Sequence, residues 1–216
     1  MNIAVMFLEL GKGFITTVEI FMLTLIFSLP LGLIISFGRM SKNGILRTIT
    51  KFYISVMRGT PLMLQLIVVY FGPYYVLGLQ LSRSYRFIAV ILAFVLNYAA
   101  YFAEIYRSGI ESMPKGQYEA AKVLGYTKEQ TFFKIILPQV IKRVMPSITN
   151  ETITLVKDTS LAFVLSIVEV FTTAKQIAAS ETTIMPLMVA GLYYYIFNLA
   201  VALGMEQIER KLNYYR

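Results

Sequence analysis

Polar side chains that could hold a ligand lie inside two of the most apolar segments of this chain. In the first segment, polar residues recur at helical spacing, at Asn97, Tyr101, Glu104 and Ser108. In the second, one helical face carries Glu151, Thr154 and Asp158, with Lys157 beside it. A charge at the centre of a bilayer costs about 2.5–3.5 kcal/mol on insertion scales, so such residues rarely face lipid. The two polar faces either line a wet cavity or pair with each other as contacts between helices.

The elements that position these residues are apolar helices. The chain has 216 residues, of which 57% are hydrophobic, and its mean hydropathy is +0.65. Soluble domains are about 45–50% apolar, so we expect an all-α integral membrane protein. An apolar helix needs about 20 residues to cross the hydrocarbon. Five segments qualify, namely residues 14–38, 53–77, 87–106, 148–171 and 187–208.

Basic residues indicate which side of the membrane each connection occupies. The net charge is +8, and most Lys and Arg fall in segments 39–52, 107–147 and the tail after 208. Positive charge marks cytoplasmic connections, so we expect the N-terminus outside and the C-terminus in the cytoplasm. The same rule explains the net charge without a nucleic-acid partner, which we do not expect.

The chain lacks the residues that several classes of chemistry require. The chain has no cysteine and no histidine, which removes thiol chemistry, the commonest general base and the usual zinc ligands. No glycine-rich phosphate loop ending in Gly-Lys-Ser/Thr occurs. We therefore expect neither catalytic residues nor a metal or cofactor bound by this chain.

The segment 107–147 is the sizeable polar insert. Residues 114–116, Pro-Lys-Gly, end one helix, and residues 117–124 predict a short helix with Gly125 as its C-terminal cap. Thr127 and Gln130 match a capping box that starts a second helix, which we expect Pro138 to limit. Such a hairpin either closes a loop at the surface or docks a soluble partner.

The spacing of this insert resembles the cytoplasmic coupling loop of ABC importer permeases. The residues that match are Glu119-Ala120-Ala121, Gly125, Ile135 and Leu137-Pro138. The resemblance covers almost the whole chain. Residues 58–62, 103–110, 114–117 and 157–161 are similar to the branch that imports polar amino acids such as histidine, arginine, glutamine and glutamate.

This resemblance implies a type I ABC importer fold with five transmembrane helices in a bacterial plasma (inner) membrane. It implies that Glu119, Ala120, Ala121 and Gly125 dock a separate ATPase, which binds ATP and Mg. The implied partners are two ATP-binding subunits, a second permease chain, identical or related, and an extracytoplasmic substrate-binding protein. The chain itself would form the translocation pathway as a dimer.

Within that family we expect an amino acid to bind between the two polar segments, held by Asn97, Tyr101, Glu104, Asp158, Thr159 and Ser160. Asp158 would attract an ammonium or basic group. Carboxylates outnumber cations on these faces, which favours arginine or histidine. Arg58 either faces the substrate carboxylate or anchors its helix at the membrane surface.

Three alternatives remain open. The chain could import another small solute, it could be an ion-gradient-driven transporter, or it could be a membrane scaffold that only recruits a soluble enzyme. Gradient-driven transporters usually have more spans and no docking hairpin. A scaffold would leave Glu104 and Asp158 without a purpose inside the membrane.

Overall fold

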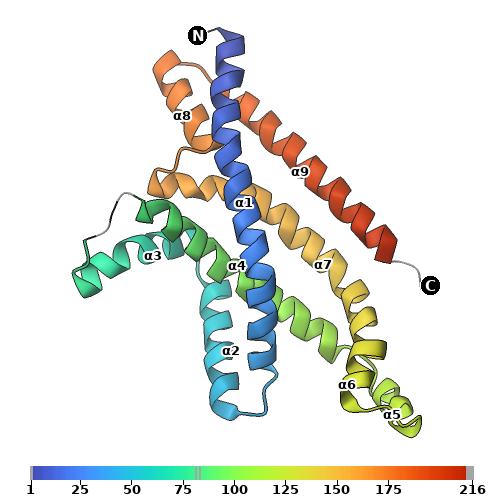
Figure 1. Cartoon of the computed structure of the whole chain (residues 1–216). Helices are drawn as coiled ribbons and strands as arrows, with labels where there is room; N and C mark the ends of the chain where they lie inside the picture. Colours follow the sequence, from blue (N-terminus) through green and yellow to red (C-terminus); the bar gives the residue numbers. More distant parts are fainter. Residues whose placement is uncertain (1, 81, 83, 213–216) are drawn as a thin grey trace.

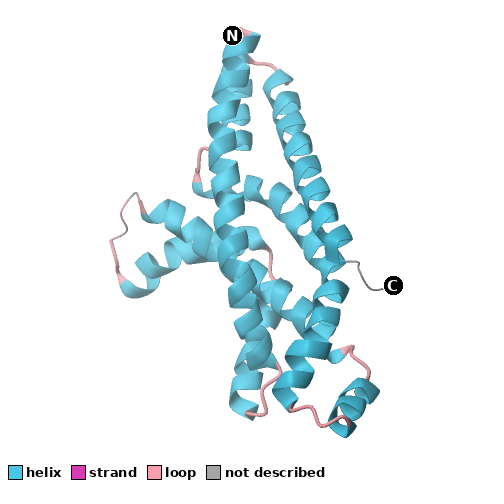
Figure 2. Cartoon of the chain, turned by 45° about the vertical axis from the view of Figure 1, so that its right-hand side comes forward, coloured by secondary structure: helices cyan, strands magenta, loops and turns pink. Residues whose placement is uncertain are grey.

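The fold is an array of long helices, which Figure 1 colours along the sequence and Figure 2 colours by secondary structure. The structure, a computed structural model, describes residues 2–80, 82 and 84–212, and this part of the chain contains no strand. The helices are α1 (Ile3–Arg39), α2 (Gly44–Gly59), α3 (Leu62–Leu77), α4 (Tyr85–Glu111), α5 (Lys115–Val123), α6 (Lys128–Gln130), the π-helix η1 (Thr131–Ile136), α7 (Leu137–Asp158), the 3-10 helix η2 (Thr159–Leu165), α8 (Val170–Glu181) and α9 (Met185–Leu212).

Helices α1 and α4 form the centre of the bundle (Figure 1). They approach closely at Gly32, where an added Cβ would lie 2.8 Å from Cβ of Phe102 and 3.0 Å from the carbonyl oxygen of Ala99. Small residues at such a crossing let two backbones come together without side chains between them. Phe102 and Ala99 are fully buried there, so this contact fixes the helix that carries most of the polar stripe.

Three of the described helices, α1, α4 and α9, are long and apolar enough to cross a membrane. Helices α2 and α3 meet that test only together, and they are bent by 113° at the break between them. One continuous helix over 53–77 is therefore the wrong expectation. Pro61 disfavours the helical conformation of the residue before it, and Thr60 is extended, with φ −122° and ψ 147°.

The segment 148–171 is not one continuous helix either. Helix α7 ends at Asp158, η2 follows, and Ser166 adopts a left-handed conformation with φ 55°. Glu169 then begins α8 as its N-cap. The polar residues at the end of the predicted span thus belong to a junction between α7 and two shorter elements, η2 and α8. The count of five spans stays a prediction.

The start of the insert agrees with the prediction, but its second helix does not end where expected. Gly125 has φ +78°, and the capping box of Thr127 and Gln130 is present. The expectation that Pro138 limits the second helix is wrong, because η1 leads directly into α7. Pro138 lacks an N–H and its ring would clash with the carbonyl of Lys134 in a regular α-helix. The wider π turn accommodates it, since the N–H of Leu137 donates to the carbonyl oxygen of Phe132.

Candidate functional site

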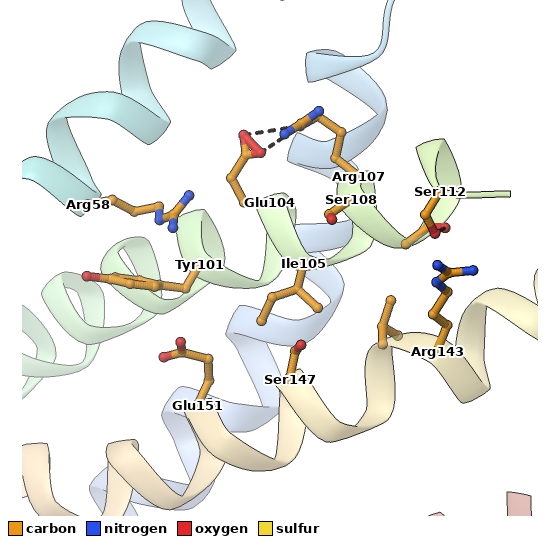
Figure 3. Close-up of a pocket in the computed structure, with 12 residues that line it drawn as sticks. Arg58, Tyr101, Glu104, Ile105, Arg107, Ser108, Ser112, Arg143, Ser147 and Glu151 are labelled. Atoms are coloured by element: carbon orange, nitrogen blue, oxygen red, sulfur yellow. Dashed lines mark hydrogen bonds and ion pairs between the residues drawn. The ribbon is translucent and has the colours of Figure 1, made fainter. Parts of the chain in front are cut away.

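A charged cavity of about 510 Å³ lies between α2, α4 and α7 (Figure 3). Its wall combines guanidinium, carboxylate, phenol and hydroxyl groups. The polar lining residues are Arg58, Tyr101, Glu104, Arg107, Ser108, Ser112, Arg143, Ser147 and Glu151. The predicted residues Tyr101 and Glu104 are therefore brought together, with charged residues from two other helices.

Arg58 and Glu151 present opposite charges to this cavity near Tyr101. The guanidinium carbon of Arg58 lies 5.2 Å from the ring centroid of Tyr101, within reach of a cation–π contact. Figure 3 shows Arg58 reaching toward Tyr101 from α2 and Glu151 rising from α7. Within the described ranges, no ion pair joins Arg58 to Glu151. Both groups thus remain able to contact a charged ligand.

Glu104 has protein partners of its own. It accepts a hydrogen bond from Nε of Arg107 at 2.6 Å, and Nε of Arg39 lies 3.9 Å away. Arg107 also pairs with Glu111. The negative charge of Glu104 is therefore offset within the wall, and this network ties the end of α1 to α4.

Asn97 lies outside the cavity wall and supports the break between α2 and α3. Its side-chain amide donates to the carbonyl oxygen of Met57 and to Oε1 of Gln65, each at 3.0 Å. Gln65 in turn donates to the carbonyl oxygens of Met57 at 2.9 Å and Thr60 at 3.1 Å. Carbonyls that a broken helix leaves unpaired at membrane depth must be satisfied by such groups. The polar stripe of α4 thus serves both purposes considered from the sequence, with helix contact at Asn97 and cavity wall from Tyr101 onward.

Asp158, Thr159 and Ser160 lie at the junction of α7 with η2, two turns beyond Glu151. Oδ2 of Asp158 accepts a hydrogen bond from the hydroxyl of Tyr98 at 2.7 Å. The hydroxyls of Thr159 and Ser160 donate to carbonyl oxygens one turn back, at 2.7 and 2.8 Å. None of the three residues lines the cavity of Figure 3. Their contact with substrate stays a prediction.

Glu169 is a buried carboxylate whose contacts could not be predicted from the sequence. It is fully buried and caps α8, accepting from the N–H groups of Phe171 at 2.7 Å and Thr172 at 2.6 Å. It also accepts from the hydroxyl of Tyr194 on α9 at 2.7 Å. A carboxylate at a helix N-terminus is stabilised by the unpaired N–H groups there. The prediction of one continuous helix over 148–171 leaves no place for a helix that begins at Glu169.

The insert projects from one end of the bundle, where α5 lies beside α6 at the base of the helix that continues through η1 into α7 (Figure 1). Glu119 and Ala120 are exposed, whereas Ala121 is only 1% exposed and packs toward the chain. Apolar side chains beside them are left in solvent, with Val123 87% and Leu124 73% exposed. Large exposed apolar groups on a short polar helix indicate a protein interaction surface.

Helix α5 is joined to α7 by a reciprocal pair of amides. Gln117 donates to Oε1 of Gln139 at 2.8 Å, and Gln139 donates to Oε1 of Gln117 at 2.9 Å. A displacement of α5 would therefore act on the helix that carries Arg143 and Glu151 into the cavity.

Comparison with known proteins decides the family. The family described as "Binding-protein-dependent transport system inner membrane component" matches residues 28–214. This chain belongs to that family. It is a permease, the non-catalytic pathway subunit of an ABC transporter, as the resemblance of the insert implied.

Two curated relatives of this permease cover most of its length. It is 40% identical over 202 residues to the arginine transport system permease protein ArtQ of Bacillus subtilis, covering 93% of this chain and 91% of that protein. It is 35% identical over 203 residues to the putative glutamine transport system permease protein GlnP of Rickettsia conorii, with the same coverages.

Solved structures agree with the type I importer fold of this permease. A crystal structure of an amino acid ABC transporter with histidines matches with a TM-score of 0.87 and 28% identity, covering 98% of this chain and 99% of that one. The MetNI methionine transporter, in an inward-facing conformation, matches with a TM-score of 0.69 at 18% identity, which shows the fold alone.

Proposed function

We propose that this permease carries an amino acid across the bacterial inner membrane, and that the cavity of Figure 3 is part of its route. The observation that carries the proposal is the opposition of Arg58 to Glu151 across a polar cavity, with no ion pair between them. Glu151 is half-buried and Arg58 is exposed, and within the described residues neither has a side-chain hydrogen bond or an ion pair. Two opposite charges that do not pair are suited to a ligand that carries both charges.

An α-amino acid has the matching chemistry. A guanidinium binds a carboxylate through two parallel hydrogen bonds, so Arg58 suits the substrate carboxylate. Glu151 suits the ammonium, and Asp158 lies further along the same face of α7 for a second polar contact. We also propose that Tyr101, Glu104, Thr159 and Ser160 contribute to the substrate-binding site. Asn97 contributes indirectly, because it holds the break between α2 and α3 in place.

The charge balance of the cavity argues for recognition of the zwitterion rather than of a basic side chain. Three arginines and two glutamates line it, and Glu104 is already paired. The relatives are named for glutamine, arginine and L-cystine transport. We therefore propose a polar amino acid as substrate, with arginine and histidine among the candidates rather than favoured by excess carboxylate.

Transport would be driven by partner chains. In this proposal a dimer of permease chains, identical or related, meets two ATP-binding subunits that bind ATP and Mg, and an extracytoplasmic binding protein delivers the substrate. The ATPase docks on Glu119, Ala120, Ala121 and Gly125 on the cytoplasmic side, with the N-terminus outside and the C-terminus inside. Closure of the ATPase moves α5, and the amide pair to α7 transmits this motion as a rigid-body rearrangement.

The test is uptake by proteoliposomes that contain the permease, its ATPase and its binding protein. Labelled arginine, histidine, glutamine and cystine are supplied with and without ATP. We expect ATP-dependent uptake of at least one of them. Glu151→Gln should reduce that uptake roughly tenfold or more, because a charged hydrogen bond is lost.

Glu206→Gln is the matched control, since Glu206 pairs with Arg210 on the exposed part of α9. It should leave uptake unchanged. Uptake driven by an ion gradient without ATP would overturn the importer mechanism, and full uptake by Glu151→Gln would remove this cavity from the route.

A further inference from the structure

A second cavity, of about 810 Å³, lies where the start of α7 meets the end of α9. Cations and apolar side chains share its wall. The lining residues are Met113, Lys134, Ile135, Pro138, Gln139, Lys142, Arg143, Pro146 and Leu212. No carboxylate is among these described lining residues, in contrast to the cavity of Figure 3, whose wall contains Glu104 and Glu151.

The position of this cavity matters as much as its charge. It includes Met113, just beyond the end of α4, and Leu212, the last residue of α9, whose final turn also carries Arg210 and Lys211. It lies at the same end of the bundle as the insert, because Lys134 and Ile135 belong to η1. Under the proposed function, on whose orientation this inference rests, that end is the cytoplasmic edge of the hydrocarbon.

We propose that this cavity binds the headgroup of an anionic phospholipid of the inner leaflet. Lys134 is exposed and presents its ammonium group to the headgroup phosphate, and the exposed Arg143, which lines both this cavity and the cavity of Figure 3, adds a second positive charge to the wall. Basic recesses between helices on the cytoplasmic side are suited to anionic headgroups, which the leaflet supplies at high local concentration.

The apolar part of the cavity wall favours a lipid rather than a free anion as the ligand. Ile135, Pro138 and Leu212 lie beside the cations and can contact the glycerol and the first acyl methylenes. Inorganic phosphate would leave these side chains uncovered. A lipid fills both parts of the cavity and would brace η1 and α7 against α9, next to the amide pair that holds α5.

The test is retention of lipid by the purified complex of permease and ATPase. The complex is titrated with phosphatidylglycerol or phosphatidylcholine of identical acyl chains, and bound lipids are counted by native mass spectrometry. We expect phosphatidylglycerol to be retained preferentially. Lys134→Gln should weaken that retention about fivefold, and Lys134→Glu, which adds a negative charge at the same position, should weaken it further by a similar factor.

Lys128→Gln is the matched control, because Lys128 is an exposed cation of the same insert outside the cavity. It should retain phosphatidylglycerol as the unmodified chain does. Equal retention of the two lipids, unchanged retention by the lysine variants, or displacement of the lipid by inorganic phosphate would each overturn the proposal. Binding that appears only after the ATPase is removed would assign the surface to the ATPase instead.

Lipid retention is read without transport, so the two proposals fail separately. Lost lipid preference with normal amino acid uptake overturns the lipid site alone. Preferential retention in a complex that moves no amino acid overturns the substrate proposal alone.

Discussion

The hydroxyl of Tyr98 donates to Oδ2 of Asp158 at 2.7 Å and so joins the middle of α4 to the end of α7. Tyr98 is 2% exposed, and its ring is parallel to that of Phe94 at a centroid distance of 6.5 Å. The phenol is therefore fixed by its surroundings, and it holds the carboxylate in one orientation. Because α7 gives way to η2 directly after Asp158, this bond also fixes the junction.

Tyr98→Phe tests whether this orientation serves substrate binding. The ring remains, but Asp158 loses its donor. We expect the substrate concentration for half-maximal stimulation of ATPase activity in proteoliposomes to rise about tenfold, the loss expected for one charged hydrogen bond. Tyr85→Phe is the control, because its hydroxyl donates only to the backbone of Val69, away from the cavity. An unchanged response in both Tyr98→Phe and Asp158→Asn would exclude Asp158 from substrate binding.

Asn97→Leu should lower the stability of the fold, because Asn97 supports the helix break and lies outside the cavity wall. The substitution leaves the carbonyl oxygen of Met57 and the side chain of Gln65 with one donor fewer in a buried site. We expect the free energy of unfolding to fall by about 1–3 kcal/mol, measured as a lower melting temperature in detergent.

Asn198→Leu is the matched comparison for this prediction. Its buried Oδ1 has no hydrogen-bond partner among the described residues, so its removal should cost little. If Asn97→Leu and Asn198→Leu melt alike, the amide of Asn97 does not support the helix break.

This break shows where sequence reasoning reached its limit. Pro61 was visible within the apolar segment 53–77, but hydropathy alone does not tell a spanning helix from two helices bent by 113°. The groups that satisfy the broken backbone include Asn97, which comes from a helix 40 residues after Met57. No local pattern predicts that contact.

The insert was predicted better because its signals are local. The capping box of Thr127 and Gln130 lies within four residues, and a left-handed cap needs only Gly125 itself. The cavity was predicted in part. Tyr101, Glu104 and Glu151 followed from helical periodicity, whereas Arg143 faces them only because α7 crosses α4 in the fold.

Gly13→Ala should destabilise the contact between α1 and α8. An added Cβ would lie 2.7 Å from Oγ1 of Thr173 and 3.0 Å from the backbone of Glu169. Thr173 is buried and donates to the carbonyl oxygen of Glu169 at 2.9 Å, so it cannot move freely. We expect a loss of about 1–3 kcal/mol, read as a lower melting temperature.

Gly11→Ala is the control on the same helix. There the nearest atom to an added Cβ is the hydroxyl oxygen of Tyr193, at an ordinary 3.6 Å. Both variants gain the same helix propensity, about 1 kcal/mol, so their difference isolates the contact with α8. A Gly13→Ala chain that melts as high as Gly11→Ala would show that α8 yields at this point.

Gly125→Val should uncouple the ATPase while leaving substrate binding intact. Nothing lies within 4 Å of an added Cβ at Gly125, so the damage comes from φ +78° alone. A β-branched residue disfavours this left-handed conformation by roughly 1–2 kcal/mol or more, which would shift α5 relative to η1. We expect loss of substrate-stimulated ATP hydrolysis, with amino acid binding to the permease retained.

Gly125→Asn separates backbone conformation from side-chain size, because asparagine tolerates the left-handed region. It should preserve most of the coupling, whereas Glu119→Lys, at an exposed residue of α5, should abolish it by reversing the charge that the ATPase meets. Normal coupling in both Gly125→Val and Glu119→Lys would place the docking surface elsewhere. Equal loss in Gly125→Asn and Gly125→Val would mean that the glycine is needed for close approach of the partner, rather than for its left-handed conformation.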